Sequence, residues 1–134
     1  MSLGPTRQER HTELRQLLVE PIQGDGKRRV QCYVVRHKQR VGSTRFDFYM
    51  CLSKEQDMYC FTGKKTSSSR GASYSIALDQ DDGKKGKSDA AIGKIRSDKK
   101  AMEYTLFDNG AAPGSKEAKT DPLRRELMHT HFIN

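Results

Sequence analysis

Residues 92–110 read IGKIRSDKKAMEYTLFDNG and contain two short segments, of which the second has the side-chain pattern of a β-strand. The first, Ile92–Arg96, is short, apolar and basic. In the second, apolar residues alternate with their neighbours as far as Phe107, namely Met102, Tyr104 and Leu106. This two-residue period places one set of side chains on a single face of a strand. The sequence Asp-Asn-Gly at residues 108–110 then predicts a turn that ends the second strand.

The same two-residue period recurs in the preceding part of the chain. It predicts strands at residues 30–35, 46–52, 58–62 and 74–78. Three strands have an apolar face, formed by Phe46, Phe48, Met50 and Leu52, by Tyr74, Ile76 and Leu78, and by Met102, Tyr104 and Leu106. Turns or loops are expected at Ser53–Asp57, Asp79–Asp89 and Ala111–Asp121, whereas Leu123–Ile133 fits either a strand or a helix. Many short strands with turns between them indicate an all-β barrel or sandwich.

Residues 1–20 are predicted to form a tail or a short helix ahead of the β domain. Leu14, Leu17 and Leu18 have the i, i+3, i+4 spacing of an apolar helix stripe among charged neighbours. A proline and two glycines follow from Pro21 on, and they would end the helix. We expect this helix to pack as a cap against the domain, with a role in partner binding as the alternative.

Composition bounds the class of protein. A length of 134 residues corresponds to one domain or part of one. Hydrophobic residues make up 34% of the chain, which supports only a thin core. No run approaches the ~18 apolar residues of a membrane-spanning helix, and the N-terminus lacks the apolar stretch of a signal peptide. We therefore expect a soluble, basic, cytoplasmic protein.

The positive charge is concentrated in one part of the sequence. Residues 27–70 contain 11 Lys and Arg against 3 Asp and Glu, a net charge of +8. The rest of the chain contains 14 basic and 14 acidic residues and is neutral. An excess confined to one segment indicates an anionic partner, and a solvated basic face without a ligand is the alternative.

No motif in the sequence indicates catalysis, a cofactor or a metal. Gly63-Lys64-Lys65-Thr66 lacks the preceding glycine of a nucleotide-binding P-loop, because position 58 is Met. Residues 71–75 lack the closing glycine of a nucleophile elbow. The three cysteines and the histidines do not have the spacing of zinc ligands. We therefore expect a non-enzymatic protein with no catalytic residues, no cofactor and no metal site.

One segment has the composition of an anion-binding loop. Residues 63–70 combine Lys64, Lys65 and Arg70 with serines, threonine and glycine. Lysine binds phosphate as a point charge, arginine adds a planar fork of donors, and hydroxyl groups donate further hydrogen bonds. The segment is predicted to be a loop between strands that suits a phosphorylated head group, unless it is a basic loop without a ligand.

Several segments, in chain order, resemble the tubby-like domain family. They are Pro21–Lys38 (PIQGDGKRRVQCYVVRHK), Phe61–Lys65 with Ser73–Ile76, Ile92–Ser97 with Tyr104–Gly110, and Leu123–Leu127. The most specific is Ile-Gly-Lys-Ile-Arg-Ser followed by Tyr-Thr-Leu-Phe-Asp-Asn-Gly, which looks like the signature of the family. The resemblance covers residues 21–134 and corresponds to the N-terminal part of the tubby domain.

The resemblance implies a mainly β fold, a partial tubby-type antiparallel β-barrel. In the family, C-terminal strands and an apolar central helix follow the segment that resembles Leu123–Leu127, and this sequence stops soon after it. We therefore expect residues 1–20 as a tail or helix and residues 21–134 as a truncated tubby-like domain. A continuation of the chain, or a protein partner, would cover the open barrel.

The resemblance also implies a function. Tubby-like domains bind phosphatidylinositol bisphosphate at the inner face of the plasma membrane and commonly serve in delivery of membrane proteins to cilia. By position, Arg70 falls on a phosphate-contacting residue, flanked by Lys64 and Lys65. Ser68 and Glu103 stand where the family has basic residues, a departure that would remove cationic contacts. Accessory basic residues, Lys99 and Lys100, could substitute from nearby.

Three functions remain open at this point. The first is a phosphoinositide-binding membrane tether or adaptor, with other anionic lipid head groups as related ligands. The second is a structural subunit of a larger, ciliary assembly that keeps the scaffold without the lipid site. The third and least favoured is nucleic-acid binding, with Tyr33, Tyr49 or Tyr59 as stacking groups.

Overall fold

The computed structural model describes residues 7–21, 24, 26, 29–38, 44–53, 56–79 and 90–133. One α-helix, α1, spans Arg7–Val19, and a short 3₁₀-helix, η1, spans Glu117–Lys119. The strands are β1 (Gln31–His37), β2 (Thr44–Ser53), β3 (Gln56–Ser68), β4 (Gly71–Ala77), β5 (Ala91–Ser97), β6 (Glu103–Asp108) and β7 (Glu126–His131). The prediction of a mainly β domain is confirmed.

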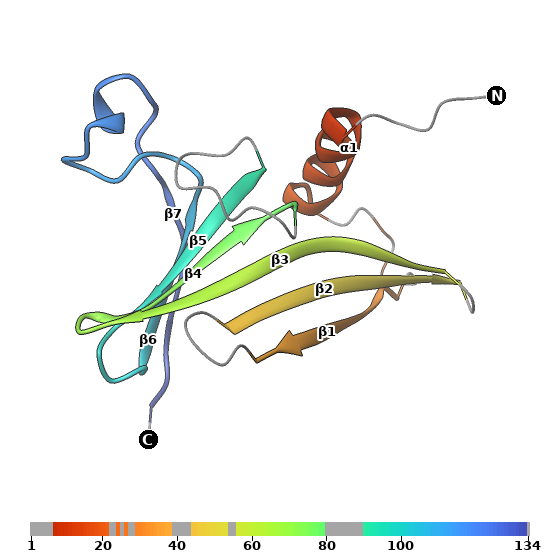
Figure 1. Cartoon of the computed structure of the whole chain (residues 1–134), viewed down its shortest axis with the longest axis horizontal. Helices are drawn as coiled ribbons and strands as arrows, with labels where there is room; N and C mark the ends of the chain where they lie inside the picture. Colours follow the sequence, from red (N-terminus) through yellow and green to blue (C-terminus); the bar gives the residue numbers. More distant parts are fainter. Residues whose placement is uncertain are drawn as a thin grey trace.

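The strands form one antiparallel sheet in chain order, β1 to β7. The longest strand, β3, joins its two halves: β2 pairs with Gln56–Lys65, and β4 pairs with Thr62–Ser68 (Figure 1). Among the described residues β1 and β7 do not pair with each other, so this sheet is not closed into a barrel. An open sheet of this kind fits the partial tubby-type fold that the sequence predicted.

One segment differs from the sequence-based expectations, and the structure decides a second that the sequence left open. The third strand, predicted at residues 58–62, continues to Ser68, so the interpretation of residues 63–70 as a loop is wrong. Pairing with β4 as far as Ser68 opposite Gly71 leaves only Ser69 and Arg70 in the turn. The ladder of backbone hydrogen bonds therefore outweighs the turn preference of the serines and glycine. The ambiguous segment Leu123–Ile133 contains a strand, β7, rather than a helix.

Some predicted features fall on residues that the structure does not describe. Residues 80–89, most of the predicted loop after β4, lie outside the described part, as do Lys54 and Glu55 of the turn after β2. Residues 1–6 of the predicted tail and Asn134 at the end of the predicted domain also lie outside it, as does the side chain of Leu52.

The helix α1 packs against one end of the sheet (Figure 1). Leu14 and Leu18 contact a small cluster formed by Ala77, Leu78 and Ala90 at the end of β4 and just before β5. The Arg15 guanidinium also donates a hydrogen bond from Nη2 to the carbonyl oxygen of Ala91 at 3.1 Å. The capping position that the leucine spacing suggested is therefore the one observed.

Aromatic side chains line one face of the sheet, which we call the apolar face. The Phe48 and Phe61 rings stack with centroids 4.4 Å apart, and Phe46 lies 6.5 Å from the Tyr74 ring. These rings are half-buried because they contact one another across neighbouring strands. Three of these residues belong to the apolar strand faces that the alternation predicted, Phe46, Phe48 and Tyr74.

The opposite face, which we call the polar face, contains a buried carboxylate. Asp47 in β2 is 1% exposed, and its Oδ1 accepts a hydrogen bond from the Thr62 hydroxyl at 2.7 Å. Its Oδ2 lies 2.9 Å from His37 Nε2 and 3.4 Å from a terminal nitrogen of Arg45. Asp47 thereby connects side chains of β1, β2 and β3.

A tyrosine completes this network. The Tyr59 hydroxyl lies 2.5 Å from the Thr62 hydroxyl, which already donates its proton to Asp47. Tyr59 is therefore the donor, and burial raises the pKa of its phenol to about 12, so it keeps its proton at neutral pH. The chain of donors points toward the carboxylate, which stabilises a buried negative charge.

Substitution of Asp47 tests this network. We expect Asp47→Ala to lower the free energy of unfolding by roughly 2–4 kcal/mol, because the Thr62 hydroxyl, the His37 imidazole and the Arg45 guanidinium lose their shared acceptor. Urea denaturation followed by circular dichroism measures the change. As a matched control, Asp57→Ala removes an exposed carboxylate that accepts a hydrogen bond from Tyr33, and it should cost less than about 1 kcal/mol. Equal effects of the two variants would contradict the account.

Candidate anion-binding site

The structure separates the two lysines that the sequence analysis grouped together. Lys64 and Lys65 are consecutive residues of β3, so their side chains point to opposite faces of the sheet. Lys65 Nζ lies 5.8 Å from the centroid of the Tyr74 ring on the apolar face. Lys64 lies opposite Arg45 in β2 and Ser75 in β4, on the polar face. The two lysines therefore cannot both lie with Arg70 on one face of the sheet, as the predicted cluster required.

Cross-strand register brings other cations beside Lys64. Lys64 pairs with Ser75, and Ser75 pairs with Lys94 of β5, so both lysines lie in one row of the polar face. In the adjacent row, Arg96 of β5 lies between Ser73 and Thr105. We call four cations of this surface the basic face: Lys64, Lys94, Arg96 and Arg124. The last of these lies just before β7.

Arg124 joins the basic face through an aromatic ring. Its guanidinium carbon lies 4.0 Å from the centroid of the Phe107 ring, and Phe107 is the residue of β6 that pairs with Lys94. The segment before β7 is held there because Arg124 donates a backbone hydrogen bond to the carbonyl oxygen of Ala111 at 2.9 Å. The ring therefore positions the guanidinium beside the lysine.

The pKa of the Lys94 ammonium group reflects the positive charges around it. Partial burial is the largest cause that lowers the pKa of its ammonium group, and the positive charges of Arg96 and Arg124 lower it further. A cation whose charged form is disfavoured by its neighbours gains from an anion that binds among them. The basic face is therefore electrostatically suited to a ligand with closely spaced negative charges.

A second group of cations lies at the adjoining end of the sheet. Arg70 is in the β3–β4 turn, and Lys99 and Lys100 are in the β5–β6 turn, all three exposed. The two turns lie against each other. The backbone at Gly71 is so close to β5 that a Cβ atom at this position would come within 2.3 Å of the Ser97 carbonyl oxygen. We call Arg70, Lys99 and Lys100 the basic tip.

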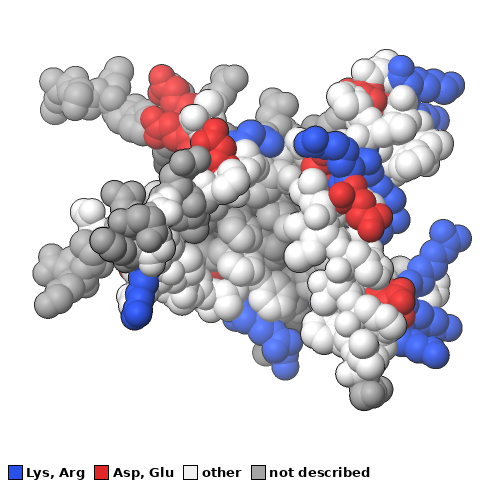
Figure 2. Space-filling model, turned by 180° about the vertical axis from the view of Figure 1, so that it is seen from behind, with Lys and Arg blue, Asp and Glu red and all other residues white. Residues whose placement is uncertain are grey.

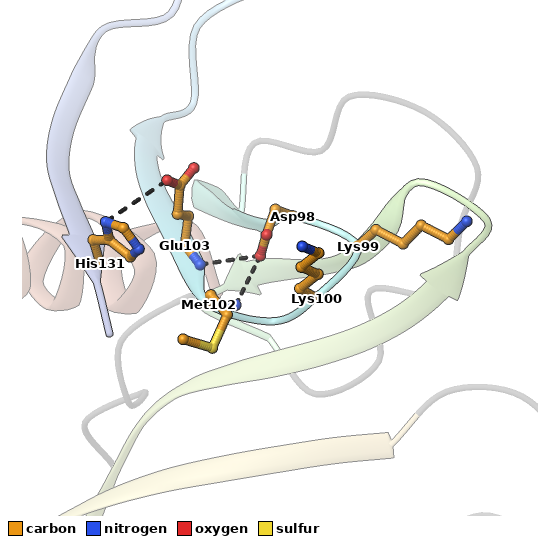
Figure 3. A pocket seen from close by; sticks show the side chains of 6 residues that line it. All are labelled: Asp98, Lys99, Lys100, Met102, Glu103 and His131. Atoms are coloured by element: carbon orange, nitrogen blue, oxygen red, sulfur yellow. Dashed lines mark hydrogen bonds and ion pairs between the residues drawn. The ribbon is translucent and has the colours of Figure 1, made fainter. Parts of the chain in front are cut away.

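The β5–β6 turn that carries two of these lysines is internally braced. Asp98 Oδ1 accepts backbone hydrogen bonds from Met102 at 2.8 Å and from Glu103 at 3.0 Å (Figure 3). Such bonds from backbone amides, the largest from Glu103, lower the pKa of the Asp98 carboxyl group. Lys99 and Lys100 belong to this braced turn and line the depression beside it.

The two departures from the family pattern have local partners. The Ser68 hydroxyl donates to the Gly71 carbonyl oxygen at 3.2 Å and accepts from the Arg70 amide at 3.3 Å, so it shapes the β3–β4 turn. Glu103 lies 3.8 Å from His131 Nδ1, across the β6–β7 pair (Figure 3). Neither residue supplies positive charge, and both take part in the structure of this end of the sheet.

Lys and Arg side chains are most prominent on one side of the view in Figure 2, whereas Asp and Glu side chains lie on both sides. Figure 2 shows Lys and Arg side chains projecting from the side that carries β5, β6 and β7, with Asp and Glu side chains between them. Lys27, Arg28, Arg40 and Lys54 of the basic segment at residues 27–70 lie outside the described residues.

The sequence analysis did not assign Lys94, Arg96 or Arg124 to the site. Two of them belong to the Ile-Gly-Lys-Ile-Arg-Ser motif, but their relation to Lys64 depends on the pairing of β3, β4 and β5. Alternation within residues 92–96 would have placed Lys94 and Arg96 on one strand face, which was the available signal.

The described part of the chain has neither a group of metal-ligating side chains nor a membrane-spanning helix. Within it, His, Cys, Asp and Glu side chains form no group of three or more that is placed to hold a metal ion. None of the helices found there is long and apolar enough to cross a membrane.

Comparison with known proteins gives a consistent match. The Tub family model covers residues 18–133. Tubby-related protein 2 of Mus musculus is 33% identical over 87 residues, which are 63% of this chain and 15% of that protein. Tubby-related protein 2 of Homo sapiens is 31% identical over 107 residues, or 73% and 20% of the two chains. Tubby-related protein 1 of Homo sapiens is 30% identical over 102 residues, or 75% and 19%. The chain thus spans a fifth or less of the length of these relatives.

The crowding of cations can be measured directly. We expect Arg124→Gln to raise the pKa of the Lys94 ammonium group, because it removes one of the positive charges that lower it. A pH titration of the Lys94 side-chain resonances by NMR gives this pKa. Arg125→Gln is the control, since that guanidinium lies 2.9 Å from Asp108 and is not among the causes of the shift. An unchanged Lys94 pKa in Arg124→Gln would show that the two groups do not interact.

Proposed function

The chain belongs to the Tub family, and from this premise we propose that it is a non-enzymatic module that binds phosphorylated lipid head groups. Phosphatidylinositol bisphosphate is the first candidate ligand. One observation carries the proposal: Lys94 lies among the positive charges of Arg96 and Arg124 on a single face of the sheet. The basic tip borders this face and supplies further cations.

The chemistry of the basic face suits a ligand with several phosphates. Arg96 and Arg124 can each offer a planar fork of donors to one phosphate, whereas Lys64 and Lys94 offer compact charges. Ser75 stands between Lys64 and Lys94 in one row, and Ser73 stands beside Arg96 in the other. A bisphosphorylated ring presents separate phosphate groups that these neighbouring cations and hydroxyls can bind together.

The cellular role is the part of the proposal that rests on the family. We propose a membrane tether or adaptor, located in the cytoplasm at the inner face of the plasma membrane and serving delivery of membrane proteins to cilia. Anionic lipids of the cytoplasmic leaflet attract such clusters of Lys and Arg. A protein partner, or further chain, would contact the half-buried rings of the apolar face.

A structural subunit without lipid binding is the second candidate. The observation that favours it is the use of Ser68 and Glu103 at positions where related domains have basic residues. Both side chains contact neighbouring groups of this chain instead. If these contacts replaced the lipid site, the cations of the basic face would not respond to phosphoinositides.

Vesicle binding distinguishes the two candidates. We expect the protein to bind vesicles that contain phosphatidylinositol bisphosphate more tightly than neutral vesicles. The double variant Lys94→Gln/Arg96→Gln should weaken this binding roughly 10-fold or more, since each cation near an anionic membrane contributes about 1 kcal/mol. Co-sedimentation at about 0.15 M salt measures the affinity, which should fall further as salt rises.

The control removes the same charge elsewhere. Lys116→Gln/Lys119→Gln changes two exposed lysines at η1, and it should alter the affinity less than about twofold. Lys65→Gln, on the apolar face, should also have little effect, whereas Arg70→Gln should weaken binding as part of the basic tip. Wild-type protein that binds the lipid vesicles no better than neutral ones would remove the proposal and favour the structural subunit.

A further inference from the structure

The row of side chains that contains Arg96 continues into β7 with a histidine. Thr105 pairs with Arg96 on one side and with His129 on the other, so the three residues share the polar face. The Thr105 hydroxyl lies 2.9 Å from His129 Nδ1, which confirms that the imidazole points to this face. His129 is exposed, because β7 is an edge strand among the described residues.

A second histidine lies two residues further along the same strand face. His131 pairs with Glu103, and its Nδ1 is 3.8 Å from a carboxylate oxygen of that residue (Figure 3). The side chains of His131 and Glu103 are 55% and 48% exposed, so both are open to solvent and to a ligand. His131 also lines the depression that Lys99 and Lys100 border. The two imidazoles therefore lie between the basic face and the basic tip.

We propose that His129 and His131 are further phosphate-contacting residues of the lipid site, and that they strengthen binding only when protonated. This inference rests on the proposed function and concerns the same surface. Histidine is the side chain that changes charge between about pH 5 and 8. Protonation adds a positive charge beside Arg96 and another beside Glu103.

The charges that face the two histidines determine the sign of the effect. From β6, Glu103 faces His131 and the uncharged Thr105 faces His129. From β5 and its following turn come Arg96, Lys99 and Lys100, together with Asp98, whose carboxylate is already held by backbone amides. The negative charge of Glu103 opposes an anionic ligand. Protonation of His131 adds a positive charge that offsets this negative charge. Acidification therefore makes this end of the sheet more positive and must tighten anion binding.

The experiment compares vesicle affinity at about pH 7.5 and about pH 5.5. Phosphatidylglycerol vesicles are the probe, because the charge of this head group does not change over the range, and phosphatidylinositol bisphosphate vesicles are measured in parallel at the higher pH. Each added positive charge should raise the vesicle affinity roughly fivefold, so the affinity of the wild type for phosphatidylglycerol should rise about 5- to 20-fold on acidification. His129→Gln/His131→Gln should lose this rise.

Two further variants separate the histidine pair from other titrating groups. His37→Gln changes a histidine at the far end of the sheet, beside Asp47, and should keep the full rise. Glu103→Gln removes the opposing negative charge and should raise the affinity several-fold already at the higher pH. Circular dichroism of each variant reports whether the sheet is intact.

The outcomes distinguish the inference from the function on which it rests. Wild-type protein that binds at the higher pH but no more tightly at the lower pH overturns the role of the histidines alone. An equal rise in wild type and in His129→Gln/His131→Gln does the same. Absence of binding to phosphatidylinositol bisphosphate vesicles at the higher pH, and to phosphatidylglycerol vesicles at both pH values, overturns the proposed function and this inference together.

Discussion

The antiparallel register of β3, β4 and β5 determines which cations of this chain meet. Because directly opposed residues share a face, the pairs Lys64–Ser75 and Ser75–Lys94 place two lysines in one row. A slip of one residue in the β3–β4 pairing would turn Lys64 to the apolar face and bring Lys65 opposite Ser75 in its place. The placement of Arg96 in the next row depends on the same pairing. The electrostatics of the candidate site is thus a consequence of backbone hydrogen bonding.

The two halves of the sheet use charge in different ways. In the half formed by β1, β2 and β3, the Asp47 carboxylate is buried and saturated by donors, including Thr62. In the half formed by β4 to β7, Lys94 lies near other positive charges. The first arrangement joins strands and leaves little for a ligand, whereas the second gains from an added anion. A ligand is therefore expected on the second half, where the turns at Arg70 and Lys99 also lie.

Much of the fold follows from local sequence patterns, and most of the site does not. Alternation and turn residues located β1 to β4 and β6, whereas β5 coincides with a segment described only as short, apolar and basic, and the segment of β7 also fitted a helix. The motif at residues 92–110 identified the family. The serines after Gly63 predicted a loop, yet pairing with β4 extends the strand, because local turn preference competes with a non-local ladder. The burial of Asp47 and the meeting of Lys64 with Lys94 depend on which strands are neighbours. Local periodicity contains no such information.

Under the proposed function, phosphate is bound by one face of the sheet rather than by a contiguous loop. NMR titration with soluble inositol 1,4,5-trisphosphate, which carries the same phosphorylated ring without the lipid, distinguishes the two arrangements. We expect saturable shifts of the side-chain resonances of Lys64, Lys94 and Arg96, while those of Lys65 on the apolar face stay unchanged. Equal shifts of Lys64 and Lys65 with none at Lys94 and Arg96 would rule out binding by this face.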